Sequence, residues 1–233
     1  MTQFVNGYRC LDCNHCFKKS QLFALLNESE LDFLNDARLE VRFKKGEIIY
    51  KQGTPLTHIV ILNEGLGKIY LEGDKGRNLI LNYTKKYELN GGVGVFLDQR
   101  HYSSLMAVTD CGACFIEIGA FKNVLRSNAT FMEAYIKAYS QRVLHTYQQF
   151  AVLTQKNMEG RIAESILFLN DRIFQNGIIK NVSNQDLAEL TAMTKESAIR
   201  VLKEFKEDGI IEIVDHSINI LDQKALQQVA AHG

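Results

Sequence analysis

The 233-residue sequence has little proline and no surplus of either charge. A single proline excludes collagen-like and proline-rich sequence, and 27 basic against 27 acidic side chains give no overall attraction for nucleic acid. No run reaches the ~20 apolar residues of a transmembrane helix, and the opening segment MTQFVNGYRC lacks the apolar core of a signal peptide. We therefore expect a globular, cytoplasmic protein of one or two domains with no membrane partner.

The common signatures of enzymes are also missing. The glycine-rich segment GGVGVF (91–96) lacks the Gly-Lys-Ser/Thr of a P-loop, and neither His-x3-His nor Gly-x-Ser-x-Gly occurs. Cys111 and Cys114 have the spacing of a thiol oxidoreductase, but they lie in a β-patterned run and not at a helix N-terminus. The sequence therefore predicts a protein that is not an enzyme.

Short β-patterned runs with glycine-containing turns fill residues 39–118. Eight runs recur at the 8–12-residue spacing of an antiparallel sandwich or jelly roll, at residues 39–43, 47–53, 58–62, 67–73, 77–84, 92–97, 104–109 and 113–119. Residues 20–36 before them predict two short helices, with Asn27 as the N-cap of the second.

The period changes between residues 128 and 157, where apolar residues alternate in steps of four and three. This is the a/d seam of a coiled coil, and a helix of this length would be roughly 45 Å long. The seam could pack on the β-domain or pair with the same helix of a second copy. Its nearly unbroken apolar character favours self-pairing through Met132, Ile136, Tyr139, Val143, Phe150 and Leu153, with Thr146 as the polar member.

The C-terminal part predicts a winged helix-turn-helix over residues 183–221. An amphipathic helix over 160–177, closed by Gly177, precedes it. Ser183 starts one short helix, Thr194 starts a second that Gly209 stops, and a hairpin around Asp215-His216 follows. Apolar side chains would hold the two helices together, namely Leu187, Leu190, Ile199, Leu202 and Phe205.

In such a motif the second helix enters the major groove of DNA. Basic side chains can donate to guanine, a glutamate can accept from cytosine, and hydroxyls can hold phosphates. The candidate DNA-binding residues are Ser183, Asn184, Gln185, Thr194, Lys195, Glu196, Ser197 and Arg200. Residues 178–233 carry six basic and nine acidic side chains, so attraction to phosphate must be local. The alternative is a helical hairpin with a solvated charged face.

The order of these parts resembles the CRP/FNR superfamily of bacterial transcription regulators. KKGEIIYKQG (44–53) is similar to its opening β-roll signature, GGVGVF (91–96) to its phosphate cassette, and GRIA (160–163) to its domain junction. SNQDLAELTAMTKESAIRVLKEFKEDGII (183–211) resembles its DNA-reading motif. The resemblance implies an α+β protein with a cyclic-nucleotide-binding-like β-roll domain (1–127), a dimerisation helix (128–157) and a winged helix-turn-helix domain (158–233). It also implies a homodimer on a palindromic operator, with RNA polymerase as a partner.

The cassette departs from the pattern of the family's cyclic-AMP binders. Those proteins have a glutamate after the first glycine and an Arg-Ser pair for the phosphate, where this chain has Gly92, Tyr102 and Ser103. Loss of the arginine removes a charge-assisted contact, so cyclic AMP is not the expected ligand. A different small molecule could lie near Gly91, Gly92, Tyr102, Ser103 and Thr146.

The N-terminal cysteines have a spacing, C-x2-C-x2-C, that can place several thiolates around a metal. YRCLDCNHCFKKSQLF (8–23) also resembles the cluster-binding region of the family's oxygen sensors, although Phe23 stands where a further ligand would fall. The resemblance implies an iron–sulfur cluster on Cys10, Cys13, Cys16 and Cys114, with Cys111 as the alternative fourth ligand. Zinc, which His15 could also bind, and a metal-free arm are the other interpretations.

The sequence thus predicts a dimeric DNA-binding regulator that responds to a redox, oxygen or small-molecule signal and not to cyclic AMP. The alternative is a thiol-based redox or metal-binding protein whose helical hairpin is only structural.

Overall fold

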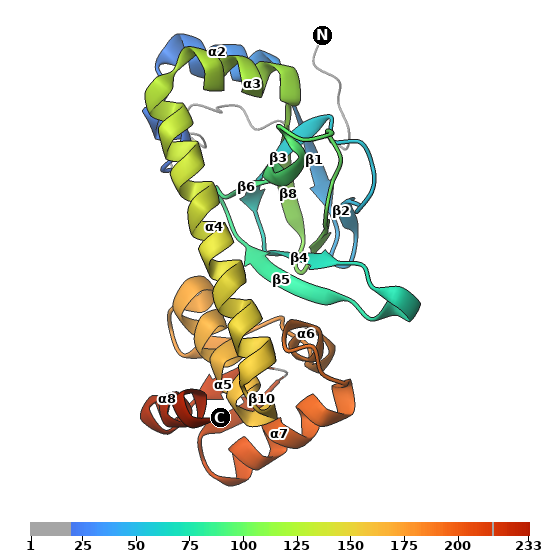
Figure 1. Ribbon diagram of the computed structural model, residues 1–233, viewed down its shortest axis with the longest axis vertical. Helices are drawn as coiled ribbons and strands as arrows, with labels where there is room; N and C mark the ends of the chain where they lie inside the picture. Colours follow the sequence, from blue (N-terminus) through green and yellow to red (C-terminus); the bar gives the residue numbers. More distant parts are fainter. Residues whose placement is uncertain (1–19, 216) are drawn as a thin grey trace. The chain divides into compact units, whose positions relative to one another are not determined.

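The computed structural model describes residues 20–215 and 217–233 (Figure 1). The described chain forms two compact units. The first contains residues up to Ile69 and Thr84–Leu144, and the second contains Tyr70–Tyr83 and His145–Gly233. Among the described residues, no helix combines the length and apolarity that a membrane span requires.

Two four-stranded sheets make up the β-roll, which is the predicted antiparallel jelly roll. One has the order β1 (Arg38–Phe43), β8 (Cys111–Glu117), β3 (His58–Glu64) and β6 (Leu89–Asn90). The other has the order β2 (Ile48–Tyr50), β7 (Ser104–Ala107), β4 (Gly67–Leu71) and β5 (Leu79–Thr84). A 3₁₀ turn, η2 (Asp74–Gly76), lies between β4 and β5.

The prediction of a strand over residues 92–97 is wrong. Residues Gly92–Gly94 form a 3₁₀ turn, η3, and the short strand β6 comes before it. Gly91 has φ 94°, a left-handed conformation that glycine adopts without strain. A Cβ on Gly94 would lie 2.1 Å from the carbonyl oxygen of Arg100. The alternation of glycine with valine therefore marks a close turn here and not a pleated strand.

Strand β3 shows how the roll is built, because both of its faces are buried. Ile59 and Ile61 belong to a helix-side core, whereas Val60 and Leu62 belong to the core of Tyr50, Leu105 and neighbouring strand residues. The two-residue period of a strand places successive side chains on opposite faces. One apolar run therefore contributes to both cores.

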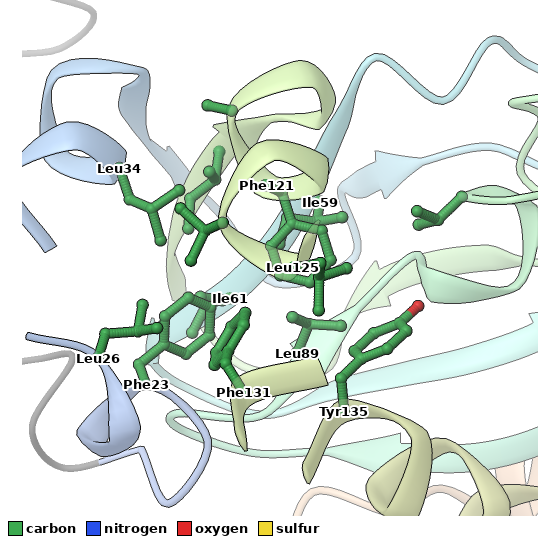
Figure 2. Packing of buried hydrophobic residues seen from close by; sticks show 14 of the residues in the cluster. Phe23, Leu26, Leu34, Ile59, Ile61, Leu89, Phe121, Leu125, Phe131 and Tyr135 are labelled. Atoms are coloured by element: carbon green, nitrogen blue, oxygen red, sulfur yellow. The ribbon is translucent and has the colours of Figure 1, made fainter. Parts of the chain in front are cut away.

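The helix-side core joins η1 (Phe23–Leu25), α2 (Glu28–Asp36), α3 (Ile118–Ser127) and the first turns of α4 (Ala129–Gln155) (Figure 2). Phe131 packs edge-on against Phe23, with ring centroids 5.5 Å apart, and against Phe121 at 5.9 Å. Asn27 caps α2 in a reciprocal capping box with Glu30, which confirms the predicted N-cap. Helix α4 agrees closely with the helix predicted over 128–157.

The second unit contains α5 (Met158–Phe168), η4 (Leu169–Phe174), β9 (Ile178–Ile179), α6 (Asn184–Leu190), α7 (Lys195–Glu207), β10 (Ile211–Val214), β11 (Ser217–Ile220) and α8 (Gln223–His232). Its small sheet has the order β10-β11-β9, with antiparallel pairing. The single helix predicted over 160–177 is divided, because η4 is a π-helical segment. The backbone amide of Gln175 donates to the carbonyl of Asn170 at 2.6 Å, a five-residue step that widens the turn.

Candidate nucleic-acid interface and effector cluster

Helices α6 and α7 form the predicted helix-turn-helix, and side-chain caps fix where each begins. The Ser183 hydroxyl accepts from the Asp186 amide at 3.1 Å, and the Asp186 carboxylate accepts from the Ser183 amide at 2.8 Å. Thr194 caps α7 by accepting from the Ser197 amide at 3.2 Å. Between the helices, Ala192 adopts φ 53°, a left-handed conformation that reverses the chain. The caps thus position the first turn of α7.

The two helices pack through buried side chains that differ in one place from the prediction. Leu187, Leu190, Leu202 and Phe205 are buried as expected, but Ile199 is 42% exposed. The inward positions of α7 are instead Ala198, Val201, Leu202 and Phe205. At 100° per residue, Ile199 lies one position away from that stripe. The prediction that Ile199 is buried relied on its hydrophobicity alone and is wrong.

The opposite face of α7 presents a row of exposed side chains. Glu196, Arg200 and Lys203 follow one another along it, with Ile199 between them. The Arg200 side chain is 57% exposed, 4.0 Å from Glu204 through Nε, with its Nη2 3.7 Å from the Met158 sulfur. Sequence reasoning missed Lys203 and the outward orientation of Ile199. The spacing of the buried residues on this helix could have located both.

The remaining candidates surround the start of α6 and the wing. Ser183, Asn184 and Gln185 are exposed, as are Thr194 and Lys195, while Ser197 is half-buried. The wing is a hairpin in which Ile211 pairs with Ile220, as predicted. Asp215 at its turn has φ 47°, and residue 216 lies outside the described residues.

In the first unit, three of the effector candidates meet a cluster of buried aromatic side chains. A Cβ on Gly91 would lie 3.6 Å from His101 Cε1, and the Tyr135 hydroxyl donates to the Gly92 carbonyl at 3.3 Å. The His101 ring stacks on Tyr50 with centroids 4.1 Å apart, and Tyr50 is hydrogen-bonded to the side chain of Ser103. We call Tyr50, Gly91, Gly92, His101, Ser103 and Tyr135 the effector cluster.

Burial keeps the aromatic groups of the effector cluster neutral. Burial lowers the pKa of His101 to about 4. It also raises the pKa of Tyr50 to about 12, although the positive charge of Arg142 acts to lower that pKa. His101 Nδ1 has no hydrogen-bond partner among the described residues. The aromatic side chains of the cluster are therefore neutral, one of their nitrogens is unsatisfied, and the charge of Arg142 acts on both Tyr50 and Tyr135.

Two effector candidates are not placed in this cluster. Tyr102 is 46% exposed, and a hydrogen bond to the Asp98 carboxylate raises the pKa of its phenol. Thr146 is exposed on α4 and belongs to the second compact unit.

The two cysteines of β8 differ in their surroundings. Cys111 faces the core shared with Tyr50 and Leu105, its thiol donates to the carbonyl of Leu66 at 3.3 Å, and burial raises the pKa of that thiol. Cys114 faces the other side of the strand, and Arg38 and Asn63 each place a nitrogen 3.7 Å from its sulfur. Cys114 therefore lies beside polar nitrogen donors, whereas Cys111 lies in an apolar core.

The other proposed ligands, Cys10, Cys13 and Cys16, and the zinc alternative His15 lie outside the described residues. Within residues 20–215 and 217–233, no group of three side chains is arranged to hold a metal ion.

Two protein families match this chain in succession. The cyclic nucleotide-binding domain family matches residues 40–128, and the Crp-like helix-turn-helix domain family matches residues 160–229. Together, a β-roll of this kind and a helix-turn-helix define the class of DNA-binding transcription regulators. The chain belongs to the CRP/FNR superfamily, whose members are regulators and not enzymes.

Relatives match along most of the chain. The fumarate and nitrate reduction regulatory protein of Escherichia coli K12 is 25% identical over 231 residues, which cover 96% of this chain and 90% of that protein. Electron transport regulator A of Shewanella oneidensis is 25% identical over 213 residues, 89% of this chain and 85% of that one. The structure of FixK2 from Bradyrhizobium japonicum has the same fold, with TM-score 0.76 at 17% identity, over 84% of this chain and 98% of that chain.

Proposed function

We propose that this regulator binds a palindromic operator as a homodimer in the cytoplasm, with RNA polymerase as its further partner. The observation that carries the proposal is the two-sided character of α7, whose inward residues are buried while Glu196 and Arg200 are exposed near its capped start. Arg200 would donate to guanine and Glu196 would accept from cytosine. Lys195 and the polar residues at the start of α6 would hold phosphates.

Replacement of Arg200 tests the recognition surface. Arg200→Ala should weaken binding to a selected operator by about 1–3 kcal/mol, roughly 5–150-fold, and relax the preference at one base position. The operator would first be selected from random DNA, and fluorescence anisotropy would compare it with its single-base variants. Lys224 is an exposed residue of α8. The control variant Lys224→Ala should bind the operator like the parent. An equal loss on operator and random DNA would assign Arg200 to a phosphate.

The dimer proposal rests on the exposed apolar face of α4. In the single chain Ile136 is 55% exposed, Tyr139 37% and Phe150 68%. All three are members of the predicted seam, which also includes Met132, Val143, Thr146 and Leu153. Met132, Val143 and Leu153 are partly buried in the single chain. Large apolar side chains exposed on one helix face are typical of an interaction site, and the 3.5-residue period fits a second copy of the same helix.

For the signal, we infer an oxygen-labile iron–sulfur cluster held by Cys10, Cys13, Cys16 and Cys114. The spacing of the three N-terminal cysteines and the cationic neighbour of Cys114 support it. The competing input is a small molecule at the effector cluster, which contains the predicted candidates Gly91, Gly92 and Ser103. Cyclic AMP is a poor candidate, because Tyr102 stands where the family's cyclic-AMP binders have the arginine that pairs with the phosphate.

Cysteine replacement separates these inputs. The double variant Cys13→Ala, Cys16→Ala, purified without oxygen, should lose its iron and its visible absorption and change its operator affinity. Cys111→Ala is the matched control, since that thiol lies in the other core, and it should keep both. If the double variant keeps the parent's metal content and DNA affinity, the iron–sulfur proposal is refuted. The effector cluster would then be the proposed sensor. Stoichiometric zinc in the parent would support the zinc alternative.

A further inference from the structure

A pocket of about 590 Å³ lies in the first compact unit, and the charge of one of its wall residues, Arg142, also acts on Tyr50 and Tyr135 of the effector cluster. Its walls are α4, the segment from Lys85 to Leu89 that joins β5 to β6, and residues 20–22. This volume is within the range of small-molecule sites. None of the residues of the effector cluster lines it.

The walls of this pocket are strongly basic. Among the described residues, four cationic side chains line it, Lys85, Lys86, Lys137 and Arg142, against the single carboxylate of Glu88. The chain as a whole is neutral, so the pocket concentrates positive charge that the average composition does not predict. A concave surface lined by one sign of charge focuses the field and attracts ions of the opposite sign.

The geometry of α4 leaves this pocket open in the proposed dimer. Ala134, Ala138 and Gln141 recur at the i, i+4 and i+7 spacing of one helix face, and the two alanines leave room above the helix. At 100° per residue these three residues lie about 120–180° from the face of Met132 and Phe150. Pairing through the seam would therefore not cover it.

The chain's own N-terminal arm is a poor occupant on grounds of charge. Residues 1–19 contain three basic side chains, Arg9, Lys18 and Lys19, and one acidic side chain, Asp12. A basic segment does not complement a basic wall. The complementary occupant is a separate molecule with several negative charges.

We propose that this pocket binds a small, multiply charged anion, a metabolite that carries phosphate or carboxylate groups. The lysines and Arg142 neutralise its charge, and the backbone of residues 85–89 and the α4 face enclose it. Its binding joins the β5–β6 segment to α4.

Calorimetry with pyrophosphate and with citrate, at constant ionic strength, tests the site on the full-length protein. At least one of the two should bind with a Kd below about 1 mM. The exposed pair Lys86→Gln, Lys137→Gln should weaken binding on the order of tenfold. Lys45→Gln with Lys51→Gln, two exposed lysines outside the pocket, is the charge-matched control and should leave it unchanged. Preference for pyrophosphate identifies a phosphate ligand, and preference for citrate a carboxylate.

A second variant removes the space and not the charge. Ala138→Phe should abolish binding while circular dichroism and operator affinity stay at parent values. If pyrophosphate or citrate removed a bound metal from the protein, the heat of that chelation would be the same for the pocket variant and for the lysine control. A difference between the two variants therefore reports binding in the pocket. Equal binding by the two lysine variants, or no binding of either anion to the parent, overturns the proposal. Neither result bears on DNA binding, which the Arg200→Ala experiment tests separately.

Discussion

Replacing Phe150 with glutamate should convert the protein into a monomer that no longer binds its operator specifically. Phe150 is 68% exposed in the single chain, and burying two such side chains in a symmetric seam would contribute about 2–4 kcal/mol. The glutamate removes this contribution and places two carboxylates across the axis. We expect the dimer to weaken by at least about 100-fold, as measured by analytical ultracentrifugation, and DNA affinity to fall with it.

A second exposed residue of α4 provides the control for this experiment. Leu144 is 57% exposed, but its heptad position lies outside the a/d seam. Leu144→Glu adds the same charge to the same helix and should leave the protein dimeric. If Phe150→Glu still sediments as a dimer and binds the operator like the parent, the seam assignment is wrong.

The helix-turn-helix could be predicted from sequence because its determinants are local. Ser183 with Asp186, and Thr194 with Ser197, are close in sequence, and each pair fixes a helix start through short hydrogen bonds. What failed was the orientation of Ile199. Its apolar side chain suggested burial, but the tertiary packing of α7 selected Ala198 and Val201. If this exposed face of α7 reads DNA, as proposed above, Ile199 would contact a thymine methyl more readily than a polar base edge.

The β-roll was predictable where strands alternate and not where glycines change the backbone. Residues 58–62 gave a clear strand because each side chain from Ile59 to Leu62 enters one of the two cores. Residues 92–97 show a similar alternation, but the left-handed Gly91 and the close approach at Gly94 require a turn. The π-helical segment η4 was equally inaccessible, because its hydrogen bonds depend on how Asn170 is held and not on hydrophobic period.

The site residues that sequence reasoning missed come from distant segments. Tyr50 and His101 meet through the fold, from β2 and from the residues just before β7, and no spacing in the sequence links them. The basic pocket is similar, since Lys86 and Lys137 are brought together only when α4 packs along the β5–β6 segment. By contrast, the candidates Gly91, Gly92 and Ser103 were chosen from continuous stretches that resemble the family's motifs, and they remain predictions as effector-binding residues.

The second large effect concerns stability. Phe131 is fully buried and contacts Phe23 and Phe121 edge-on in the helix-side core (Figure 2). Phe131→Ala should lower the free energy of unfolding by about 3–5 kcal/mol, because it removes buried apolar surface and leaves a cavity between α3, η1 and β3. Each aromatic pair lost adds about 0.5–1.5 kcal/mol to what area alone predicts, which favours the upper end of that range.

Urea unfolding followed by circular dichroism at one fixed protein concentration measures this change, since the stability of an associating protein depends on concentration. Phe33→Ala is the matched control: the same substitution on α2, at a side chain that is 45% exposed, should change stability by less than about 1 kcal/mol. Equal shifts for the two variants would mean that Phe131 does not hold the helix-side core together. If instead only Phe131→Ala unfolds early and also loses operator affinity at low urea, then the anchoring of α4 to the β-roll is necessary for DNA binding. We expect this loss of operator affinity if the proposed seam and the helix-side core lie on one rigid helix. Loosening the first turns of α4 would then also disturb the face that is proposed to pair with a second copy.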